Sequence, residues 1–299
     1  MMKQNQVEYL ERLRKQVVFW TVCMILLGIS GIVLAIVIDE AFSMVLFIGT
    51  IVLLILLYFV TVRKKWKDYV SYFKNEFISF VIKGVVPNAE YLPKKGFTRE
   101  FVSEAGLIML GNIFHSEDYV RGSFNDVAFE RSDMLIQEHH NSGKTSYTIT
   151  YLKGRWMVFE SNKSFEADLQ IIQKGYSYAK KKKGLFTKRE ERRHELKTED
   201  EWFNKEFTCL CQNDAEAFYL LTPERMQAIR KLKAEADGKL VIGFVNNRIH
   251  VIMNSGKDAF EPAFFTKNNY ERIATKARQE IEMVTTFVQS LNLDHKIYQ

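Results

Sequence analysis

Charge-free apolar residues fill two long runs near the start of the chain. One run covers 17–38 and the other covers 41–62, and each has 22 residues without a charge. At about 1.5 Å per residue, each is long enough to cross the roughly 30 Å hydrocarbon core of a bilayer. Both runs are apolar around the whole helix, and only Asp39-Glu40 separates them. The pattern predicts a transmembrane helical hairpin, with transmembrane helices at 17–38 and 41–62.

Other interpretations of the two runs fit less well. A cleaved signal peptide has a shorter apolar stretch, roughly 7–15 residues, followed by a small-residue cleavage site. Two adjacent charge-free runs are also atypical of buried helices in a soluble core. Gly28 and Gly31, with Ser30, offer small surfaces that favour close helix approach in a membrane.

Basic residues flank the two runs on their outer sides, and the connecting turn holds two acids. The flanking basic residues are Lys3, Arg12, Arg14, Lys15, Arg63, Lys64, Lys65 and Lys67. The positive-inside rule therefore predicts that both termini are cytoplasmic. In this arrangement 1–16 is a short cytoplasmic segment, and everything from Arg63 onward is cytoplasmic.

Helical spacing continues beyond the second run. The apolar positions of this stretch are Trp66, Tyr69, Val70, Phe73, Phe77, Phe80 and Val81. Pro87 predicts an end near Val85, because the residue before a proline avoids the helical region. Thr98 is a candidate N-cap for a further helix through about Leu110. We interpret 63–110 as a helical stalk and linker.

Shorter alternating segments fill the rest of the chain and predict antiparallel hairpins. The first is expected at 119–124 and 127–129, the second at 134–138 and 145–151, and a turn is expected at Lys153-Gly154-Arg155. Further on we expect a strand at 207–211, a helix from Pro223 to about Ala236 capped by Thr222, a hairpin at 239–244 and 249–253, and a closing helix at 269–291. The sequence thus predicts a membrane protein with an N-terminal transmembrane α-helical hairpin, followed by a cytoplasmic α+β domain at 111–299 with antiparallel β hairpins.

Net charge is +6 over 299 residues, and much of the excess lies in a basic insertion at 180–200. Its candidate lipid-headgroup contacts are Lys180, Lys181, Lys182, Lys183, Lys188, Arg189, Arg192 and Arg193. Anionic headgroups attract such segments by about 1 kcal/mol per basic residue. The alternative is a solvated charged loop. No nucleic-acid-binding motif accompanies the charge, so we expect no nucleic-acid partner.

Gly143-Lys144-Thr145 has the ending of a phosphate-binding loop. Such a loop needs a glycine where this chain has Glu138, and it must open a helix, whereas a β-branched run follows here. Asn141-Ser142-Gly143 is therefore interpreted as a hairpin turn, and no nucleotide cofactor is predicted.

Histidine, cysteine and acidic residues give only weak signals of chemistry. Cys209 and Cys211 lie two apart in an expected strand, a weak zinc pattern that we interpret as two small residues on one face. The set His115, Glu117, Asp118 and His139 is an alternative hydrolase site, and the same residues with His140 are an alternative metal site without a recognised spacing. We therefore predict no catalytic residue, no metal and no cofactor.

Several ordered segments carry a family resemblance. They are SEDYVRGSFNDVAFERSDM, KGRWMVFESNKSFEADLQI, FTCLCQNDAEAFYLLTPERMQAIRKL and KLVIGFVNNRIHVIMNSGKDAFEP. Over roughly Phe77 to Leu291 the chain resembles the bacterial domain-of-unknown-function family 3137. The resemblance implies a two-span protein of the bacterial inner membrane, with one cytoplasmic domain and no established activity. It also implies a LemA-type membrane protein as a partner.

The matching residues have plain structural interpretations as turns, caps and core. They are Asp118, Gly122, Phe129, Leu221, Pro223, Phe260 and Glu261. The function expected from the sequence is a protein-binding or scaffolding module in the cytoplasm, attached to the lipid bilayer. The alternatives are a membrane-anchored hydrolase built on His115, Glu117, Asp118 and His139, and an anionic-lipid-sensing domain.

Overall fold

The computed structural model describes residues 4–37, 40–124, 127–161, 165, 167–179, 193–258, 260–265 and 269–290. The chain divides into two compact units. We call Met1–Val81 with Phe260–Thr275 the helical unit, and Ile82–Ala259 with Lys276–Gln299 the sheet domain.

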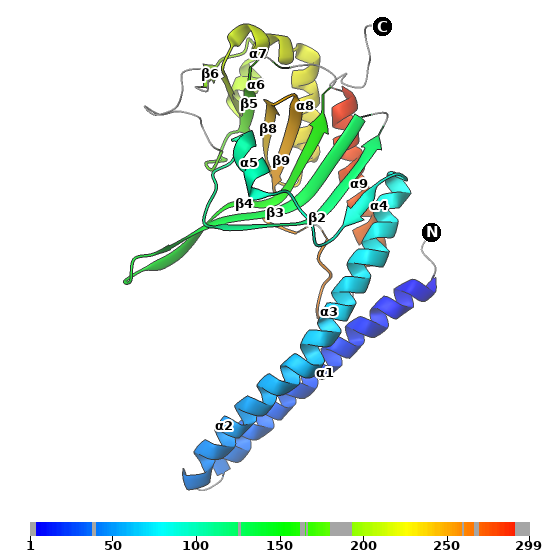
Figure 1. The fold of residues 1–299 in the computed structure, drawn as a ribbon, viewed down its shortest axis with the longest axis vertical. Helices are drawn as coiled ribbons and strands as arrows, with labels where there is room; N and C mark the ends of the chain where they lie inside the picture. Colours follow the sequence, from blue (N-terminus) through cyan, green and yellow to red (C-terminus); the bar gives the residue numbers. More distant parts are fainter. Residues whose placement is uncertain are drawn as a thin grey trace. The chain divides into compact units, whose positions relative to one another are not determined.

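Long helices build the helical unit. They are α1 (Gln4–Val37), α2 (Glu40–Leu57), the π-helical turn η1 (Tyr58–Val62), α3 (Arg63–Tyr72), a second π-helical turn η2 (Phe73–Ile78) and α4 (Ser79–Val85), which continues into the sheet domain from Ile82. From α2 to α4 the chain is helical without a break, and it ends at Val85 as Pro87 predicted. Figure 1 shows α1 and α2 running side by side.

Glycines bring α1 and α2 close together. A Cβ atom added at Gly31 would lie 2.4 Å from Cγ2 of Thr50, and one at Gly28 would lie 3.3 Å from Cδ1 of Leu54. Gly28 and Gly31 therefore face the second helix, as expected of small residues at a membrane helix contact. Ser30 points elsewhere and donates to the carbonyl oxygen of Leu27 at 2.9 Å.

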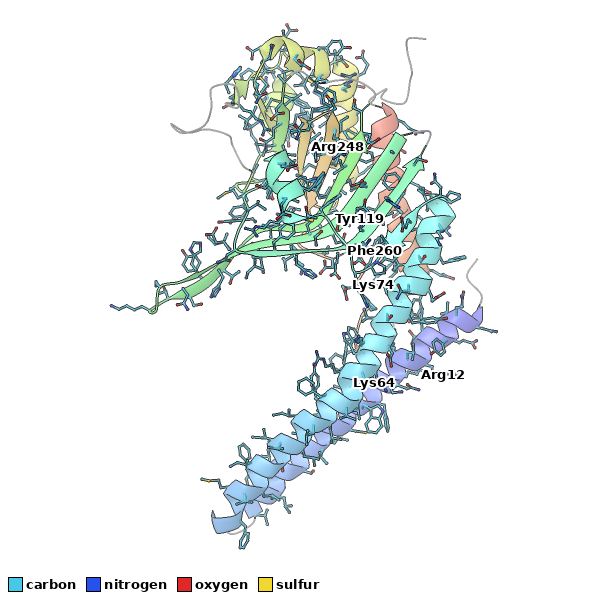
Figure 2. The ribbon with its side chains drawn as sticks, in the orientation of Figure 1. Arg12, Lys64, Lys74, Tyr119, Arg248 and Phe260 are labelled. Carbon is cyan, nitrogen blue, oxygen red and sulfur yellow. The ribbon has the colours of Figure 1, made fainter. Side chains whose placement is uncertain are left out.

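Apolar side chains of α1 and α2 are turned outward. Both helices are long and apolar enough to cross a membrane, and only 6 % of the most apolar window of each is buried. Phe42 is 70 % exposed and Ile36 is 78 % exposed. Arg12 and Lys64 lie at the same end of the pair (Figure 2), where Lys65 Nζ donates to Oε1 of Gln16 at 3.0 Å.

Polar and aromatic contacts hold Phe260–Thr275 within the helical unit. Lys74, which is 5 % exposed, pairs with Glu261 at 2.8 Å. The ring of Phe264 lies 5.0 Å from that of Trp66, and the ring of Tyr270 lies 5.4 Å from that of Phe77. The apolar stripe predicted at 66–81 is thus a packed face, except at Phe80, which is 39 % exposed.

In the part of the sheet domain that the structure describes, there are nine strands and several helices. The elements are β1 (Glu90–Leu92), α5 (Arg99–Ala105), β2 (Ile113–Phe124), β3 (Val127–Asn141), β4 (Ser146–Glu160), β5 (Leu169–Gln173), β6 (His194–Leu196), α6 (Glu201–Glu206), β7 (Phe207–Cys211), α7 (Asp214–Leu220), α8 (Pro223–Glu235), β8 (Lys239–Val245) and β9 (Arg248–Asn254). Helix α9 (Tyr270–Ser290) begins in the helical unit and continues into the sheet domain.

All nine strands belong to one antiparallel sheet. Their order is β1-β2-β3-β4-β9-β8-β5-β7-β6. In Figure 1, α5 covers one face, while α8 and α9 lie behind the other. Apolar residues such as Met134, Trp156 and Ile252 form the core with Val102 of α5. The alternate residues of β3 and β4, among them Arg131 and Arg155, face α9 and reach Glu280.

Many predicted elements are confirmed by the structure. The strand Phe207–Cys211 has the predicted bounds, and α8 begins at Pro223 with the Thr222 hydroxyl accepting from the backbone N–H of Arg225 at 3.4 Å. Asn246 and Asn247 form the β8–β9 turn with φ values of 52° and 58°, as a tight hairpin requires.

Two local predictions are wrong. Lys153-Gly154-Arg155 is not a turn but part of the continuous strand β4. The glycine serves a close approach instead, because a Cβ at Gly154 would lie 2.0 Å from the carbonyl oxygen of Met253. The helix capped by Thr98 ends at Ala105 and not near Leu110, because Gly106 adopts φ 59° and closes it with a left-handed cap.

Candidate functional site

The ends of β3 and β4 project from the sheet as a two-stranded hairpin, here called the hairpin arm (residues 137–150). The last residue of β3 that pairs with β2 is Gln137, and the pairing of β4 with β9 begins only at Arg155. Beyond Gln137 the described strands therefore pair only with each other, up to Asn141 and Ser146. Figure 1 shows this part of β3 and β4 running away from the rest of the sheet.

The tip of the hairpin arm is the turn that was predicted. Gly143 has φ 79°, and its backbone N–H donates to Oδ1 of Asn141 at 3.0 Å. The backbone N–H of Ser142 donates to the carbonyl oxygen of Thr145 at 3.0 Å. Strand β4 follows directly, so Lys144 does not open a helix and the loop lacks the geometry of a phosphate cradle.

Aromatic groups occupy one face of the hairpin arm. His140 and Tyr147 are cross-strand partners, and their rings are stacked with centroids 5.0 Å apart. Tyr147 is 54 % exposed. Nearer the sheet, the Tyr151 hydroxyl donates to the carboxylate of Glu138 on the same face. This face therefore offers rigid rings to solvent.

The other face of the hairpin arm is a ladder of hydrogen bonds. Gln137 Nε2 donates to the hydroxyl of Thr150 at 2.9 Å, and Nδ1 of His139 lies 3.1 Å from the hydroxyl of Thr148. The Asn112 side chain bonds both the N–H and the carbonyl oxygen of His139, each at 2.8 Å. These bonds fix the register of the arm where it leaves β2.

The alternative hydrolase set is not assembled. His115 lies 3.7 Å from Glu117 along β2, and it is paired with Leu135 of β3. His139 lies four residues beyond Leu135, which is roughly 13 Å along a strand. Asp118 is 1 % exposed and accepts from the Tyr91 hydroxyl at 2.5 Å. These four residues form no shared site.

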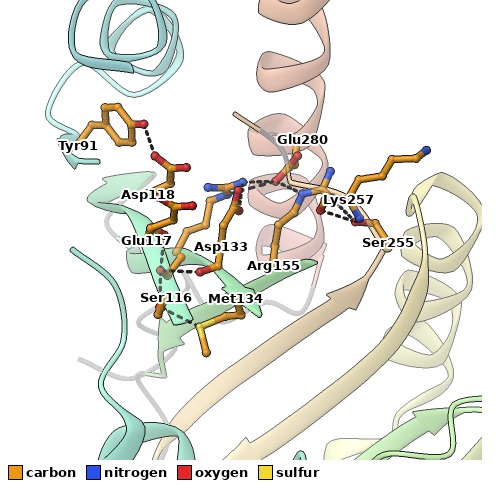
Figure 3. A network of polar contacts seen from close by, with 12 residues as sticks. Tyr91, Ser116, Glu117, Asp118, Asp133, Met134, Arg155, Ser255, Lys257 and Glu280 are labelled. Carbon is orange, nitrogen blue, oxygen red and sulfur yellow. Dashed lines mark hydrogen bonds and ion pairs between the residues drawn. The ribbon is translucent and has the colours of Figure 1, made fainter. Parts of the chain in front are cut away.

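Four buried ionisable side chains lie where β3 and β4 meet α9, and we call them the charge network. Arg131 lies 2.9 Å from Asp133 and 2.9 Å from Glu280, and Arg155 lies 2.7 Å from Glu280. Arg155 also donates to the Ser255 hydroxyl at 3.0 Å. Figure 3 shows Asp133, Arg155 and Glu280 converging on one another. The network fastens α9 to the base of the hairpin.

Burial and ion pairing act in opposite directions on the acids of the charge network. Burial raises the pKa of Asp133 to about 7, and Arg131 offsets this only in part. Burial also acts to raise the pKa of Glu280, but Arg131 and Arg155 outweigh it, so that this pKa is lowered. Glu280 is therefore the ionised centre of the network.

A cavity of about 720 Å³ borders the charge network. Its lining mixes cations and anions from β4, α8, β9 and α9: Arg155, Lys231, Glu235, Asp237, Met253, Lys257, Lys276, Gln279, Glu280, Glu282, Met283 and Thr286. The balance of signs does not select a ligand of one charge.

Most of the predicted lipid contacts lie outside the described residues: Lys180, Lys181, Lys182, Lys183, Lys188, Arg189 and Arg192. For Arg193 the prediction is wrong. Arg193 is 2 % exposed, and it pairs with Asp168 at 2.6 Å and donates to Oε1 of Gln170 at 2.8 Å. Its guanidinium holds β6 to β5 and is not available to a lipid headgroup.

The sequence did not predict the hairpin arm or the charge network as units. The turn at Asn141–Gly143 was correctly placed, but the length of β3 and β4 was not. A signal existed in the uncharged polar residues 139–143, which lack the alternation of apolar and polar positions typical of a strand that packs on a core. Glu280 joins Arg131 across 149 positions of sequence, and no local pattern indicates such a pair.

Comparisons with known proteins give a family and little else. Residues 150–293 match the family model described as "Protein of unknown function (DUF3137)". No curated protein matches the chain. The crystal structure of the mycobacterial trehalose monomycolate transport factor A, TtfA, is similar with a TM-score of 0.39 and 8% identity, over 73% of this chain and 95% of that one. That likeness is too low to establish a shared fold.

Proposed function

The chain belongs, through residues 150–293, to the DUF3137 family of unknown function, and we propose that it is a bacterial inner-membrane protein whose sheet domain binds another protein in the cytoplasm. The observation that carries this proposal is the hairpin arm. It is a two-stranded element with a stacked aromatic pair at its surface, and it packs against the core of the sheet domain through Ile149.

Membrane attachment is supported by the outward apolar surface of α1 and α2. A long helix in the core of a soluble protein is mostly buried, whereas only 6% of the most apolar window of each of these two helices is buried. Lipid tails can cover that surface at no cost in backbone hydrogen bonds, since a helix satisfies its own. Arg12 and Lys64 at one end of the pair support a cytoplasmic position for both termini.

Orientation is tested with a reporter that is active only in the periplasm. Fused after Gln299, it should be silent, while the same reporter inserted at Asp39-Glu40 should be active. Strong activity at Gln299 would reverse the proposed orientation.

Three properties of the hairpin arm suit a protein partner. Its aromatic face presents His140 and Tyr147, and tyrosine is enriched at interfaces because its ring is large and rigid. When its histidines are neutral, the arm has one Glu and one Lys and therefore no net charge. A surface without net positive charge does not favour nucleic acid or anionic lipid as the partner. The outer backbone edge at 146–150 has no neighbouring strand among the described residues, and such edges accept an extended segment of a partner.

The base of the arm supports recognition by limiting its motion. The charge network and the strands β2 and β9 hold β3 and β4 on both sides. A binding element held on a rigid sheet loses less conformational entropy on binding than a mobile loop. A LemA-type membrane protein is the partner implied by the family resemblance.

Crosslinking in intact membranes tests the proposal. In the matched variant, 139–148 is replaced by Asn-Gly, so that a two-residue turn joins the existing pair Glu138 and Ile149. We expect a crosslinked protein, identified by mass spectrometry, that the wild type captures and the shortened variant does not. An unchanged set of crosslinks in the shortened variant, with the same protein level, would contradict a role of the arm.

Contact with anionic lipid is a second candidate, favoured by the seven Lys and Arg residues in 180–192. In nanodiscs, a Glu-specific protease should cleave at Glu190 and Glu191 more slowly with anionic than with neutral lipid. High salt, or glutamine at Lys180 to Lys183, should remove the difference. Equal cleavage in both lipids would leave this run as a solvated segment.

A further inference from the structure

Three side chains that can bind a metal meet at the far edge of the sheet, in the sheet domain. Nε2 of His194 lies 2.5 Å from Oδ1 of Asp214. Sγ of Cys211 lies 3.7 Å from the same nitrogen and 3.4 Å from the same oxygen. All three ligand atoms lie within 4.8 Å of one another.

Strand register and a helix cap hold this cluster together. His194 of β6 and Cys211 of β7 are direct partners in the antiparallel pair, so their side chains share one face. Asp214 follows three residues later as the first residue of α7. The Asn213 side chain accepts from the backbone N–H groups of Ala215 and Glu216, which fixes that start. The three donors therefore come from three ordered elements.

We propose that His194, Cys211 and Asp214 bind a divalent transition metal, and that Zn²⁺ fits the donor set best. Imidazole, thiolate and carboxylate are the three side-chain ligands that zinc uses in proteins. No part of the proposed protein-binding role depends on this site, because the hairpin arm belongs to β3 and β4, the third and fourth strands of the order, whereas β6 is the last.

Distances within the cluster agree with a tetrahedral ion. Metal bonds are about 2.3 Å to sulfur and about 2.0–2.1 Å to nitrogen and oxygen. In a tetrahedral site the sulfur then lies about 3.5 Å from the nitrogen and from the oxygen, and the nitrogen lies about 3.4 Å from the oxygen. The two sulfur distances, 3.7 Å and 3.4 Å, already match. Only the contact between His194 and Asp214 must lengthen, by about 1 Å.

Exposure allows that adjustment. The His194 and Asp214 side chains are 54% and 58% exposed, whereas Cys211 is 0% exposed beneath them. An ion can enter from solvent between the two outer side chains and complete its shell with the buried sulfur. Three protein ligands with a solvent-facing fourth position are typical of zinc sites that keep an open coordination place.

A thiol nucleophile is a poorer interpretation of the same cluster. Burial and the hydrogen bond to Asp214 raise the pKa of Cys211 to about 12, whereas reactive cysteines have a lowered pKa and are accessible. A metal ion acts differently, because it takes the place of the thiol proton and holds the sulfur as a bound thiolate.

Cobalt titration of the full chain in detergent tests the proposal. After treatment with a chelator, the protein should bind one Co²⁺ per chain with the intense visible bands of a tetrahedral site and a thiolate charge-transfer band in the near ultraviolet. Added Zn²⁺ should bleach both. The absence of a stoichiometric complex would overturn the site.

Variants separate this cluster from the rest of the chain. Cys211→Ser should lose the charge-transfer band, and His194→Ala and Asp214→Ala should each weaken binding at least about tenfold, the loss seen even for outer partners of ligands. His194→Ala and Asp214→Ala change exposed residues, so a loss of metal binding in these variants does not reflect misfolding. Cys209→Ser, in the same strand, and His139→Ala should bind as the wild type does. A band that survives in Cys211→Ser would contradict the proposal.

Discussion

The two halves of the β3–β4 hairpin have the same backbone pairing and opposite surroundings. At its base, 129–136 pairs with 152–159, with β2 and β9 on either side and helices over both faces. In the hairpin arm beyond Gln137, the described strands pair only with each other, and the Asn112 side chain bonds the backbone of His139. Trp156 at the base is 0% exposed, whereas Tyr147 in the arm is 54% exposed. Backbone pairing alone therefore does not decide whether a strand serves stability or recognition; the neighbours of its side chains decide it.

The base should respond most strongly to the loss of Trp156. Trp156→Ala removes a fully buried ring and leaves His250 without the indole N–H that donates to it at 3.1 Å. We expect a loss of about 3–5 kcal/mol in the free energy of unfolding. The matched control is Trp202→Ala, because Trp202 is 39 % exposed under Arg230. Thermal unfolding of the full chain in detergent measures the stability of both variants. Similar decreases in melting temperature for Trp156→Ala and Trp202→Ala would contradict a special role of the hairpin base in stability.

The charge network should respond next. Glu280→Gln removes the carboxylate shared by Arg131 and Arg155 and leaves two buried cations with less compensation, which costs about 3 kcal/mol. The pKa of Glu280 is lowered, since both arginines outweigh burial. Its contribution is therefore present at neutral pH, and it is lost as the pH falls through the lowered value. A glutamine substitution at the exposed Glu282 provides the control variant. A difference in the free energy of unfolding between the wild type and Glu280→Gln that persists at acid pH would contradict this role.

Asp133 should show the opposite pH dependence. Burial raises its pKa to about 7, so the folded protein keeps a proton that the unfolded chain has released above about pH 4. Stability then falls as the pH rises between these values, by at most about 1.4 kcal/mol per pH unit. Asp133→Asn removes the titration, and the stability of the wild type relative to this variant should fall between pH 5 and pH 7. The control variant is Asp237→Asn, which changes an exposed residue and keeps Asp133.

The tip of the hairpin arm should be the least sensitive to substitution. Lys144→Ala changes an exposed residue of a turn, and we expect a stability change within about 0.5 kcal/mol. ATP and GTP should leave the melting temperature of both proteins unchanged. A nucleotide-dependent shift that the variant loses would show that the loop binds phosphate.

Local chemistry made much of the fold predictable from the sequence. Asn246-Asn247 tolerates positive φ, Thr222-Pro223 is a cap followed by a first-turn proline, and the long charge-free runs form the apolar helices α1 and α2. The errors arose where tertiary contacts override local rules. Gly154 has the composition of a turn but lies in a strand because Met253 approaches it closely.

The candidate sites were less predictable for the same reason. His194 and Cys211 become neighbours only through the register of β6 on β7. The two residues are 17 positions apart in the sequence, and no local pattern specifies that register. Arg193 was expected to face lipid because it ends a basic run. It is buried because Asp168 and Gln170 of another strand region meet it.

Site-specific photo-crosslinking tests the central claim, that the hairpin arm binds a protein partner. A photoreactive phenylalanine analogue replaces Tyr147 in the arm or, as a control, Tyr219 of α7, which is 60% exposed. In intact cells, illumination should give one discrete adduct with the label at Tyr147 and not with the label at Tyr219. That adduct should disappear when an excess of unlabelled wild-type protein competes for the partner, but not when the shortened variant does. Identical adducts at both positions, or none at Tyr147 in cells where the protein is correctly inserted, would contradict the account.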